Sequence, residues 1–246
     1  MDSVPEIISE AQSAGVSRIL NVGYTLETSQ LACAQSEISP LLFAAVGIQP
    51  HDADAFSEEI AQQIVCLAKS HRKVVAIGEI GIDAFHNLST MKNQIACYMH
   101  FLTLATELNL PVIVHMRNSY KEVINGVREH SAQGIRGVIH CFTGTVAEAR
   151  VFLDLGFYIS FSGIVTFKSP SELDEVVRFI PKDRILCETD APYLAPKPFR
   201  GKTNHPAYVT HVAIHLAKLR NENPLVFAQA STENALSLFT GMRNDC

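Results

Sequence analysis

The sequence predicts one α/β domain in which parallel strands alternate with helices. Three observations lead to this prediction. Short apolar runs alternate with segments of helical periodicity, the runs are continuously apolar, and no Pro-, Gly- or Ser-rich linker divides residues 1–246. Continuously apolar strands are typical of parallel sheets that are covered on both faces. A pattern of this length indicates either a doubly wound sheet or a (β/α)8 barrel.

Seven runs have the length and the apolar character of buried strands. In chain order they are RILNVG (18–23), FAAVGI (43–48), VVAIGEI (74–80), PVIVHM (111–116), GVIHCF (137–142), FYISFSG (157–163) and RILCET (184–189). A closed barrel of this type needs eight strands, so one strand is missing from the count.

The segments between these runs have the spacing of helices that bury one face. The clearest covers 92–108, with apolar side chains at Ile95, Tyr98, Met99 and Leu102. Others are expected at 57–69, 119–131, 145–155, 171–179, 206–220 and 224–240, and the chain opens on a helix over 4–14. No G-x-G-x-x-G follows an early strand, which disfavours a dinucleotide-binding fold.

Composition excludes several classes of protein. The net charge is -5 and the pI about 6.0, unlike a protein that coats nucleic acid through bulk positive charge. The six cysteines form no C-x-x-C, which indicates a reducing compartment rather than a zinc ribbon or a disulfide framework. No apolar run approaches membrane-spanning length. We expect a cytoplasmic protein without a membrane partner or an obligate protein partner.

Polar residues stand at the ends of the predicted strands. The strands deliver Glu79, His115, His140 and Asp190, and His51 follows the second one. In a barrel these positions lie at the rim where active sites form. Imidazoles and carboxylates are ligands for divalent metals, and a metal there would activate water. A single histidine at a strand end is more often hydrogen-bonded to its neighbours than bound to a metal, and a single glutamate there often pairs with a loop arginine.

Longer motifs resemble the TatD family of metal-dependent deoxyribonucleases. They are AVGIQPHDA (45–53), GEIGID (78–83), LNLPVIVHMR (108–117), IHCFTG (139–144), GFYISFSGIVTFK (156–168), IPKDRILCETDAPYLAPKPFRGKTNHP (180–206) and STENALSLF (231–239). They run in the family's order over nearly the whole chain. The resemblance implies a (β/α)8 TIM-type barrel that hydrolyses DNA phosphodiesters with two divalent metals.

The resemblance also implies roles for the strand-end residues. Glu79 would bridge the metals, and His115 and His140 would hold one of them with it. Asp190 would bind or orient the water at the other. Glu79 and Asp190 would therefore be the catalytic residues, and the ions could be Mg, Mn or Zn.

Basic residues near the presumed rim could contact substrate phosphates. By motif position they are Arg117 and Lys168, and His51 is a further candidate for substrate binding. The segment KPFRGK adds Lys197, Arg200 and Lys202. Such contacts give affinity without sequence specificity, which suits a nuclease. The alternative for the KPFRGK cluster is a solvated surface.

The chain departs from the family pattern at three places. It has no H-x-H, whereas the family begins with a strand ending in D-x-H-x-H that binds the first metal. Gln49 stands where the family usually has His, and His205 where it commonly has Glu. We hypothesise that Met1 is an internal or misassigned start, and that upstream residues supply the missing strand. The chain as given is then expected to bind at most one divalent ion tightly, to be poorly soluble or oligomeric, and to have little nuclease activity.

Two other functions remain open from the sequence. A related barrel hydrolase would cleave an amide, a lactone or an aminoacyl ester, although many of these enzymes use a carboxylated lysine where this chain has Glu79. The other is a chain that has lost its first metal site, either truncated at the N-terminus with impaired activity or surviving as a non-enzymatic binding or vestigial protein. Assays of DNA digestion and small-molecule release, together with metal content, separate these possibilities.

Overall fold

The computed structural model describes residues 3–168 and 171–243, which fall into two compact units. The first, here called the β1–β5 unit, contains residues 18–139 and 238–243. The second, the β6–β7 unit, contains residues 3–17, 140–168 and 171–237.

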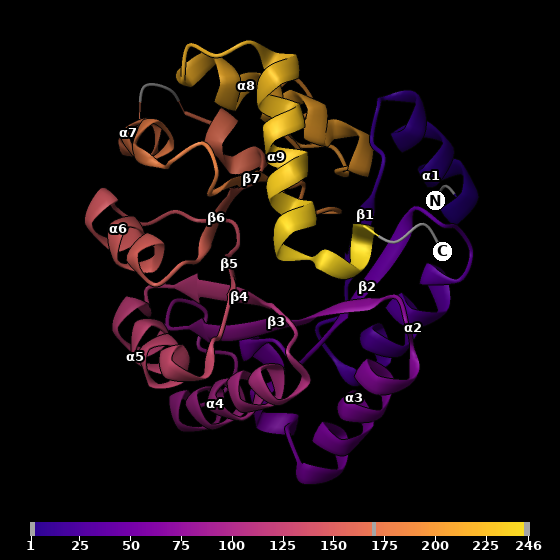
Figure 1. Ribbon diagram of the computed structural model, residues 1–246, viewed down its shortest axis with the longest axis vertical. Coiled ribbons are helices and arrows are strands. Elements are labelled where there is room, and N and C mark those ends of the chain that lie inside the picture. Colours follow the sequence, from indigo (N-terminus) through magenta and orange to yellow (C-terminus); the bar gives the residue numbers. More distant parts are fainter. Residues whose placement is uncertain (1–2, 169–170, 244–246) are drawn as a thin grey trace. The chain divides into compact units, whose positions relative to one another are not determined.

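Five parallel strands form the sheet of the β1–β5 unit (Figure 1). They are β1 (Ile19–Val22), β2 (Leu42–Val46), β3 (Val74–Asp83), β4 (Val112–Arg117) and β5 (Gly137–Ile139), and they pair in chain order. Every residue of β2 is buried, as expected for a strand covered on both faces. Apolar burial of this kind stabilises the sheet by about 25 cal/mol per Å².

Helices cover the outer face of these strands (Figure 1). They are α2 (Leu26–Ser36), α3 (Glu58–Ser70), α4 (Met91–Leu108) and α5 (Tyr120–His130). The unit also contains the short helices η1 (Pro50–Ala55), η2 (Ser131–Gln133) and η5 (Thr240–Arg243). Side-chain oxygens cap the N-termini of α2 and α3. The hydroxyl of Thr25 accepts from the backbone N–H of Thr28, and that of Ser57 accepts from the N–H of Ile60. Helix α4 ends at Asn109, whose φ of 53° is left-handed.

The β6–β7 unit has one pair of parallel strands, β6 (Tyr158–Phe161) and β7 (Ile185–Cys187), with Ile159 opposite Ile185. Its helices are α1 (Val4–Ser13), α6 (Val146–Asp154), α7 (Glu172–Phe179), α8 (Val209–Leu219) and, except for its last residue, α9 (Pro224–Leu238). Short helices η3 (Gly163–Thr166) and η4 (Pro206–Tyr208) complete it. Asn234 of α9 donates to the carbonyls of Lys182 and Ile185, and so anchors the tail helix on β7.

The predicted α/β class is confirmed, and each of the seven predicted strands is found in the described part of the chain. The structure adds three residues to the end of the third strand, so that β3 reaches Asp83. One helix, α2, was not predicted. Its sequence, LETSQLACAQS, has few large apolar residues, and it buries small ones such as Ala32 and Cys33 against the sheet.

None of the helices over 3–168 and 171–243 combines the length and the apolarity that a membrane span needs.

Candidate metal centre

A β-bulge in β3 places Glu79 in the β1–β5 unit. Ile77 lies opposite Val112 of β4, and Ile80 lies opposite Val114, so β3 contains one residue more than its partner between these points. Bulges re-aim side chains and are common beside active sites. The backbone N–H of Glu79 donates to the carbonyl of Gly23 at 3.0 Å, which holds the bulge at the end of β1.

The carboxylate of Glu79 meets the imidazole of His115 across these strands. Glu79 Oε1 and His115 Nδ1 are 3.0 Å apart. The other ring nitrogen of His115, Nε2, lies 3.2 Å from Asp83 Oδ2. The ring of His115 therefore has a carboxylate at each nitrogen, which fixes its orientation.

Asp83 is a buried carboxylate that accepts hydrogen bonds from several directions. Oδ1 accepts from the backbone N–H groups of Phe85 and His86, each at 2.8 Å. Oδ2 lies 2.8 Å from both His51 Nε2 and His86 Nδ1. Burial alone would raise the pKa of Asp83, but the hydrogen bonds from His115, His86 and His51 hold it well below its usual range. Asp83 is therefore an anion at neutral pH.

The backbone around Asp83 is held by buried polar side chains. Gln94 Oε1 accepts from the N–H of Asp83, and Gln94 Nε2 donates to its carbonyl. Ser119 donates to the carbonyl of Ile82. Arg117, at the end of β4, stacks its guanidinium over the ring of Phe85, 4.3 Å from the centroid.

The side chain of Gln49, which stands where the family usually has His, donates a hydrogen bond to Asp52.

In the β6–β7 unit the carboxylate of Glu188 lies beside His140. His140 Nδ1 is 3.4 Å from Glu188 Oε1. The same oxygen accepts from the N–H of Cys141 at 2.9 Å, and Oε2 accepts from the hydroxyl of Ser160. Glu188 therefore helps to hold the start of the segment after β5, together with Ser160 and Ser162.

Asp190 lies in the turn that follows β7, in a left-handed conformation with φ 58°. Asn204 is buried and donates to the carbonyls of Thr189 and Tyr193, so it secures the turn on both sides. Burial, aided by the charges of Glu188 and Asp190, raises the pKa of the Cys141 thiol to about 12. The carboxylates of Glu188 and Asp190 therefore both lie near the Cys141 thiol.

Arg200, a basic residue of the β6–β7 unit, lies over an aromatic ring. The guanidinium of Arg200 lies 4.7 Å from the ring centroid of Phe167. Phe167 immediately precedes Lys168 in the sequence. Lys168, Arg200 and Lys202 are exposed. His205 serves a structural purpose here, because its Nδ1 accepts from the N–H of Ala207 and caps η4.

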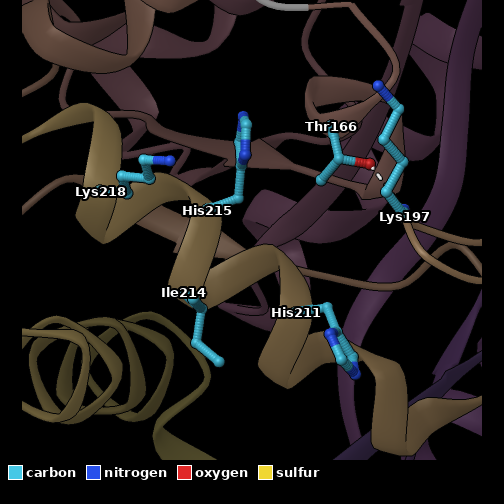
Figure 2. Close-up of a pocket in the computed structure, with 6 residues that line it drawn as sticks. All are labelled: Thr166, Lys197, His211, Ile214, His215 and Lys218. Carbon is cyan, nitrogen blue, oxygen red and sulfur yellow. Dashed lines mark hydrogen bonds between the residues drawn. The ribbon is translucent and has the colours of Figure 1, made fainter.

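A cavity of about 300 Å³ lies beside α8 in the same unit (Figure 2). Thr166, Lys197, His211, Ile214, His215 and Lys218 line it. His211, His215 and Lys218 follow the spacing of one helix face, and Lys197 comes from the opposing loop. These six described residues offer three kinds of donor and no carboxylate, a combination that suits an anion.

The donor atoms of Glu79 and His115 fit a divalent metal ion. Two neighbouring ligands at right angles on an ion with bonds of about 2.1 Å would be about 3.0 Å apart. That matches the 3.0 Å between Glu79 Oε1 and His115 Nδ1. A neutral imidazole that donates from Nε2 to Asp83 keeps the lone pair of Nδ1 for the ion.

Comparison with known proteins identifies the family. The family described as TatD-related DNase matches residues 1–240. YabD of Bacillus subtilis (strain 168), named an uncharacterised metal-dependent hydrolase, is 41% identical over 234 residues, which are 95% of this chain and 91% of YabD. TatD of Cronobacter sakazakii, named a 3'-5' ssDNA/RNA exonuclease, is 37% identical over 240 residues, covering 95% and 90% of the two chains.

A solved structure agrees with these relatives. The TatD homologue YjjV from Escherichia coli K12 has a TM-score of 0.90 and 30% identity, covering 96% of this chain and 91% of its own. The chain is thus a metal-dependent hydrolase, a hydrolytic enzyme of the barrel class that the sequence predicted. It belongs to the TatD family.

The structure brings together some of the predicted site residues within each unit. Glu79 and His115 are in contact, and His51 joins them through Asp83. His140 and Asp190 both lie near Glu188 and Cys141. Three residues that contribute were not predicted to be part of the site: Asp83, His86 and Glu188. A carboxylate at the end of a strand was the signal for Asp83 and Glu188, whereas nothing in the sequence distinguished His86.

Proposed function

We propose that this chain is a divalent-metal-dependent nuclease that cleaves phosphodiester bonds of DNA, acting on single strands from an end. The observation that carries the proposal is the series Glu79–His115–Asp83, in which a buried anion orients an imidazole toward a second carboxylate. Such carboxylate–histidine pairs support metal ligands. The exonuclease name of the Cronobacter sakazakii relative supports the substrate class.

Glu79 and His115 would hold the ion through Oε1 and Nδ1. His140 and Asp190 would be further metal ligands, and this assignment is supported by the sequence resemblance alone. A bound divalent ion would supply Lewis acidity toward a phosphoryl oxygen and would lower the pKa of water. Asp83 keeps the ring of His115 in one tautomer, and Asp190 would orient the attacking water. Mg, Mn and Zn all accept these ligand types.

Basic side chains of the β6–β7 unit would bind the substrate backbone. Arg200 is held on Phe167, and Lys202 is exposed two residues later. Arginine binds phosphate with two parallel hydrogen bonds, and lysine binds it as a point charge. Because these contacts read no base edges, we expect little sequence preference. Arg117, Lys168 and His51 are further candidates for substrate contact.

The test is the Glu79→Ala variant with end-labelled single-stranded DNA and added Mn or Mg. We expect the rate to fall at least ~1,000-fold, which corresponds to about 4 kcal/mol of lost stabilisation. Circular dichroism checks that the variant is folded, and Glu59→Ala, an exposed carboxylate of α3, is the matched control. RNA, a lactone and an aminoacyl ester are assayed in parallel. Wild-type activity in Glu79→Ala, or turnover of the small molecules alone, would overturn the proposal.

A further inference from the structure

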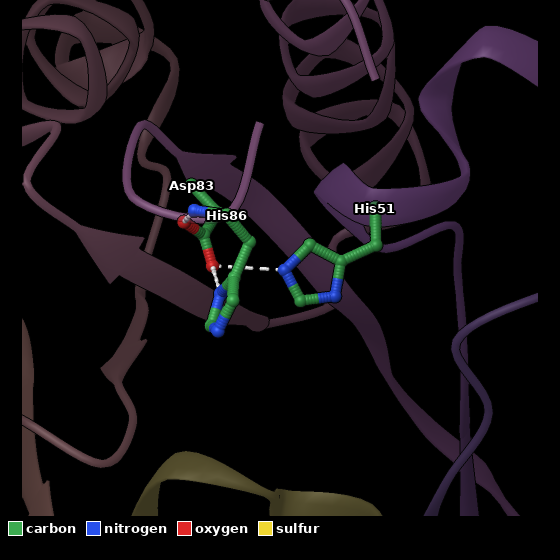
Figure 3. A group of neighbouring side chains, drawn as sticks. All are labelled: His51, Asp83 and His86. Atoms are coloured by element: carbon green, nitrogen blue, oxygen red, sulfur yellow. Dashed lines mark hydrogen bonds and ion pairs between the residues drawn. The ribbon is translucent and has the colours of Figure 1, made fainter. Parts of the chain in front are cut away.

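Two imidazoles approach one carboxylate oxygen from different elements of the β1–β5 unit (Figure 3). His51 comes from η1, and His86 from the turn after β3. His51 Nε2 and His86 Nδ1 each lie 2.8 Å from Asp83 Oδ2. The two rings are nearly perpendicular, with centroids 5.2 Å apart, so both nitrogens can point at one position.

The backbone fixes this carboxylate so that one oxygen faces the imidazoles. Asp83 Oδ1 is engaged by the N–H groups of Phe85 and His86, and Oδ2 is left for the rings. His51 is held as well, because its carbonyl accepts from the hydroxyl of Ser89 at 2.7 Å. A site that is held in this way loses little entropy when a ligand arrives.

The three donor atoms suit a transition metal. One oxygen of an ionised carboxylate and two neutral imidazole nitrogens are ligands for Zn, Co, Ni and Cu. The three ligand atoms lie within 4.8 Å of one another. Neighbouring ligands of an ion with bonds of about 2.1 Å are about 3.0–3.4 Å apart, so the rings need to move outward by only a few tenths of an ångström.

The Asp83 end of this three-residue cluster is buried, and its imidazole end is exposed to solvent. The side chain of Asp83 is 0% exposed, while those of His51 and His86 are 24% and 41% exposed. An ion can therefore enter between the rings and replace the hydrogen bonds that they make to Asp83. Bulk water can supply its remaining ligands.

We propose that His51 Nε2, Asp83 Oδ2 and His86 Nδ1 form a second site for a divalent transition metal, distinct from the pair Glu79–His115. The two sites face opposite edges of the His115 ring, since Nδ1 meets Glu79 and Nε2 meets Asp83. This site goes beyond the proposed nuclease function, and neither stands or falls with the other.

The experiment counts zinc in the metal-stripped Glu79→Ala variant, where the pair Glu79–His115 is disabled. Zinc alone is the probe, and isothermal titration gives affinity and stoichiometry. Adding His86→Ala should weaken the remaining zinc site at least ~10-fold, the lower end of what losing even an outer-shell partner costs. Adding His71→Ala, a partly exposed histidine outside the cluster, should change nothing.

Two results would overturn the proposal: no zinc binding in Glu79→Ala, or equal affinity in the His86→Ala and His71→Ala backgrounds. If the chain with His86→Ala fails to fold, the Glu79→Ala chain alone still decides. In histidine-selective ¹H–¹⁵N spectra, zinc should shift His51 Nε2 and His86 Nδ1, and unshifted resonances would refute the site. DNA cleavage is measured separately, so a failed nuclease assay leaves this test intact.

Discussion

At the scale of single residues, Asp83 organises several histidines of the site, although the sequence did not single it out. It is fully buried, yet its carboxylate meets His51, His86 and His115 and two backbone N–H groups. A buried charge is tolerated only where it is paired or saturated with hydrogen bonds. The tautomers of three imidazoles are therefore set by one side chain.

Thiol reactivity tests the burial of the charged neighbourhood around Cys141. Its pKa of about 12 leaves about one thiolate in ten thousand at pH 8, and the pKa of Cys97 is also raised to about 12 by burial. Cys66 is exposed. Iodoacetamide at pH 8 should label Cys66 first, with Cys97 and Cys141 labelled only after denaturation, as read by peptide mass mapping. Early labelling of Cys141 in the native protein would contradict the raised pKa of this partly exposed thiol.

At the scale of secondary-structure elements, the contact between β3 and β4 positions the pair Glu79–His115. Gly81 lies opposite His115, with φ 139°, a conformation that residues with a Cβ rarely adopt. A Cβ on Gly81 would overlap the backbone carbonyl of His115. The close approach of the two strands therefore requires glycine at this position.

Gly81→Ala should lower the free energy of unfolding by at least about 2 kcal/mol, because backbone strain and steric overlap add. The control is Gly134→Ala, where φ is 78° but a Cβ would meet nothing within 4 Å. Gly134→Ala should lower the free energy of unfolding by only about 1 kcal/mol, the energy of the unfavourable backbone conformation alone. Urea unfolding midpoints at equal m-values measure both. Equal losses in the two variants would show that β3 and β4 can separate without penalty.

The basic loop after β7 supports the second prediction at this scale. Arg200→Ala with Lys202→Ala should weaken binding of single-stranded DNA about equally across sequences. It should also flatten the salt dependence by about 0.7 in the log–log slope for each lost phosphate contact. The control pair Lys121→Ala and Arg128→Ala lies on the exposed surface of α5. Fluorescence anisotropy at several salt concentrations decides, and an unchanged slope would assign Arg200 and Lys202 to a solvated surface.

At the scale of the whole molecule, metal binding is linked to stability. An ion that binds only the folded chain at 100 times its dissociation constant stabilises it by about 2.7 kcal/mol. For a chain of this size about 1 kcal/mol corresponds to roughly 2–4 °C in Tm. Adding Mn to the stripped protein should therefore raise Tm by roughly 5–10 °C, as measured by calorimetry, and chelation should reverse it. If Tm changes neither when Mn is added nor when it is chelated, no site of the protein binds Mn tightly.

Hydrophobic patterning was sufficient to locate seven strands and most helices, because a parallel strand buried on both faces must be continuously apolar. The apolar runs predicted Glu79, His115, His140 and Asp190 at strand ends, but Glu79 lies inside β3, because this strand continues to Asp83. The assignment of residues 1–246 to one domain stays a prediction, as do the roles of these four residues. Helix α2 escaped prediction because its buried face consists of small residues.

The tertiary structure alone decided how the polar residues meet. His51 and His115 each stand 32 residues from Asp83, and no local pattern could pair them with one carboxylate oxygen. The bulge that aims Glu79 depends on the register of β3 against β4, which neither strand specifies by itself. Apolar periodicity is a local property, set by which face of an element is buried. Hydrogen bonds between side chains depend on ångström-scale distances between elements, and these arise only when the strands pack.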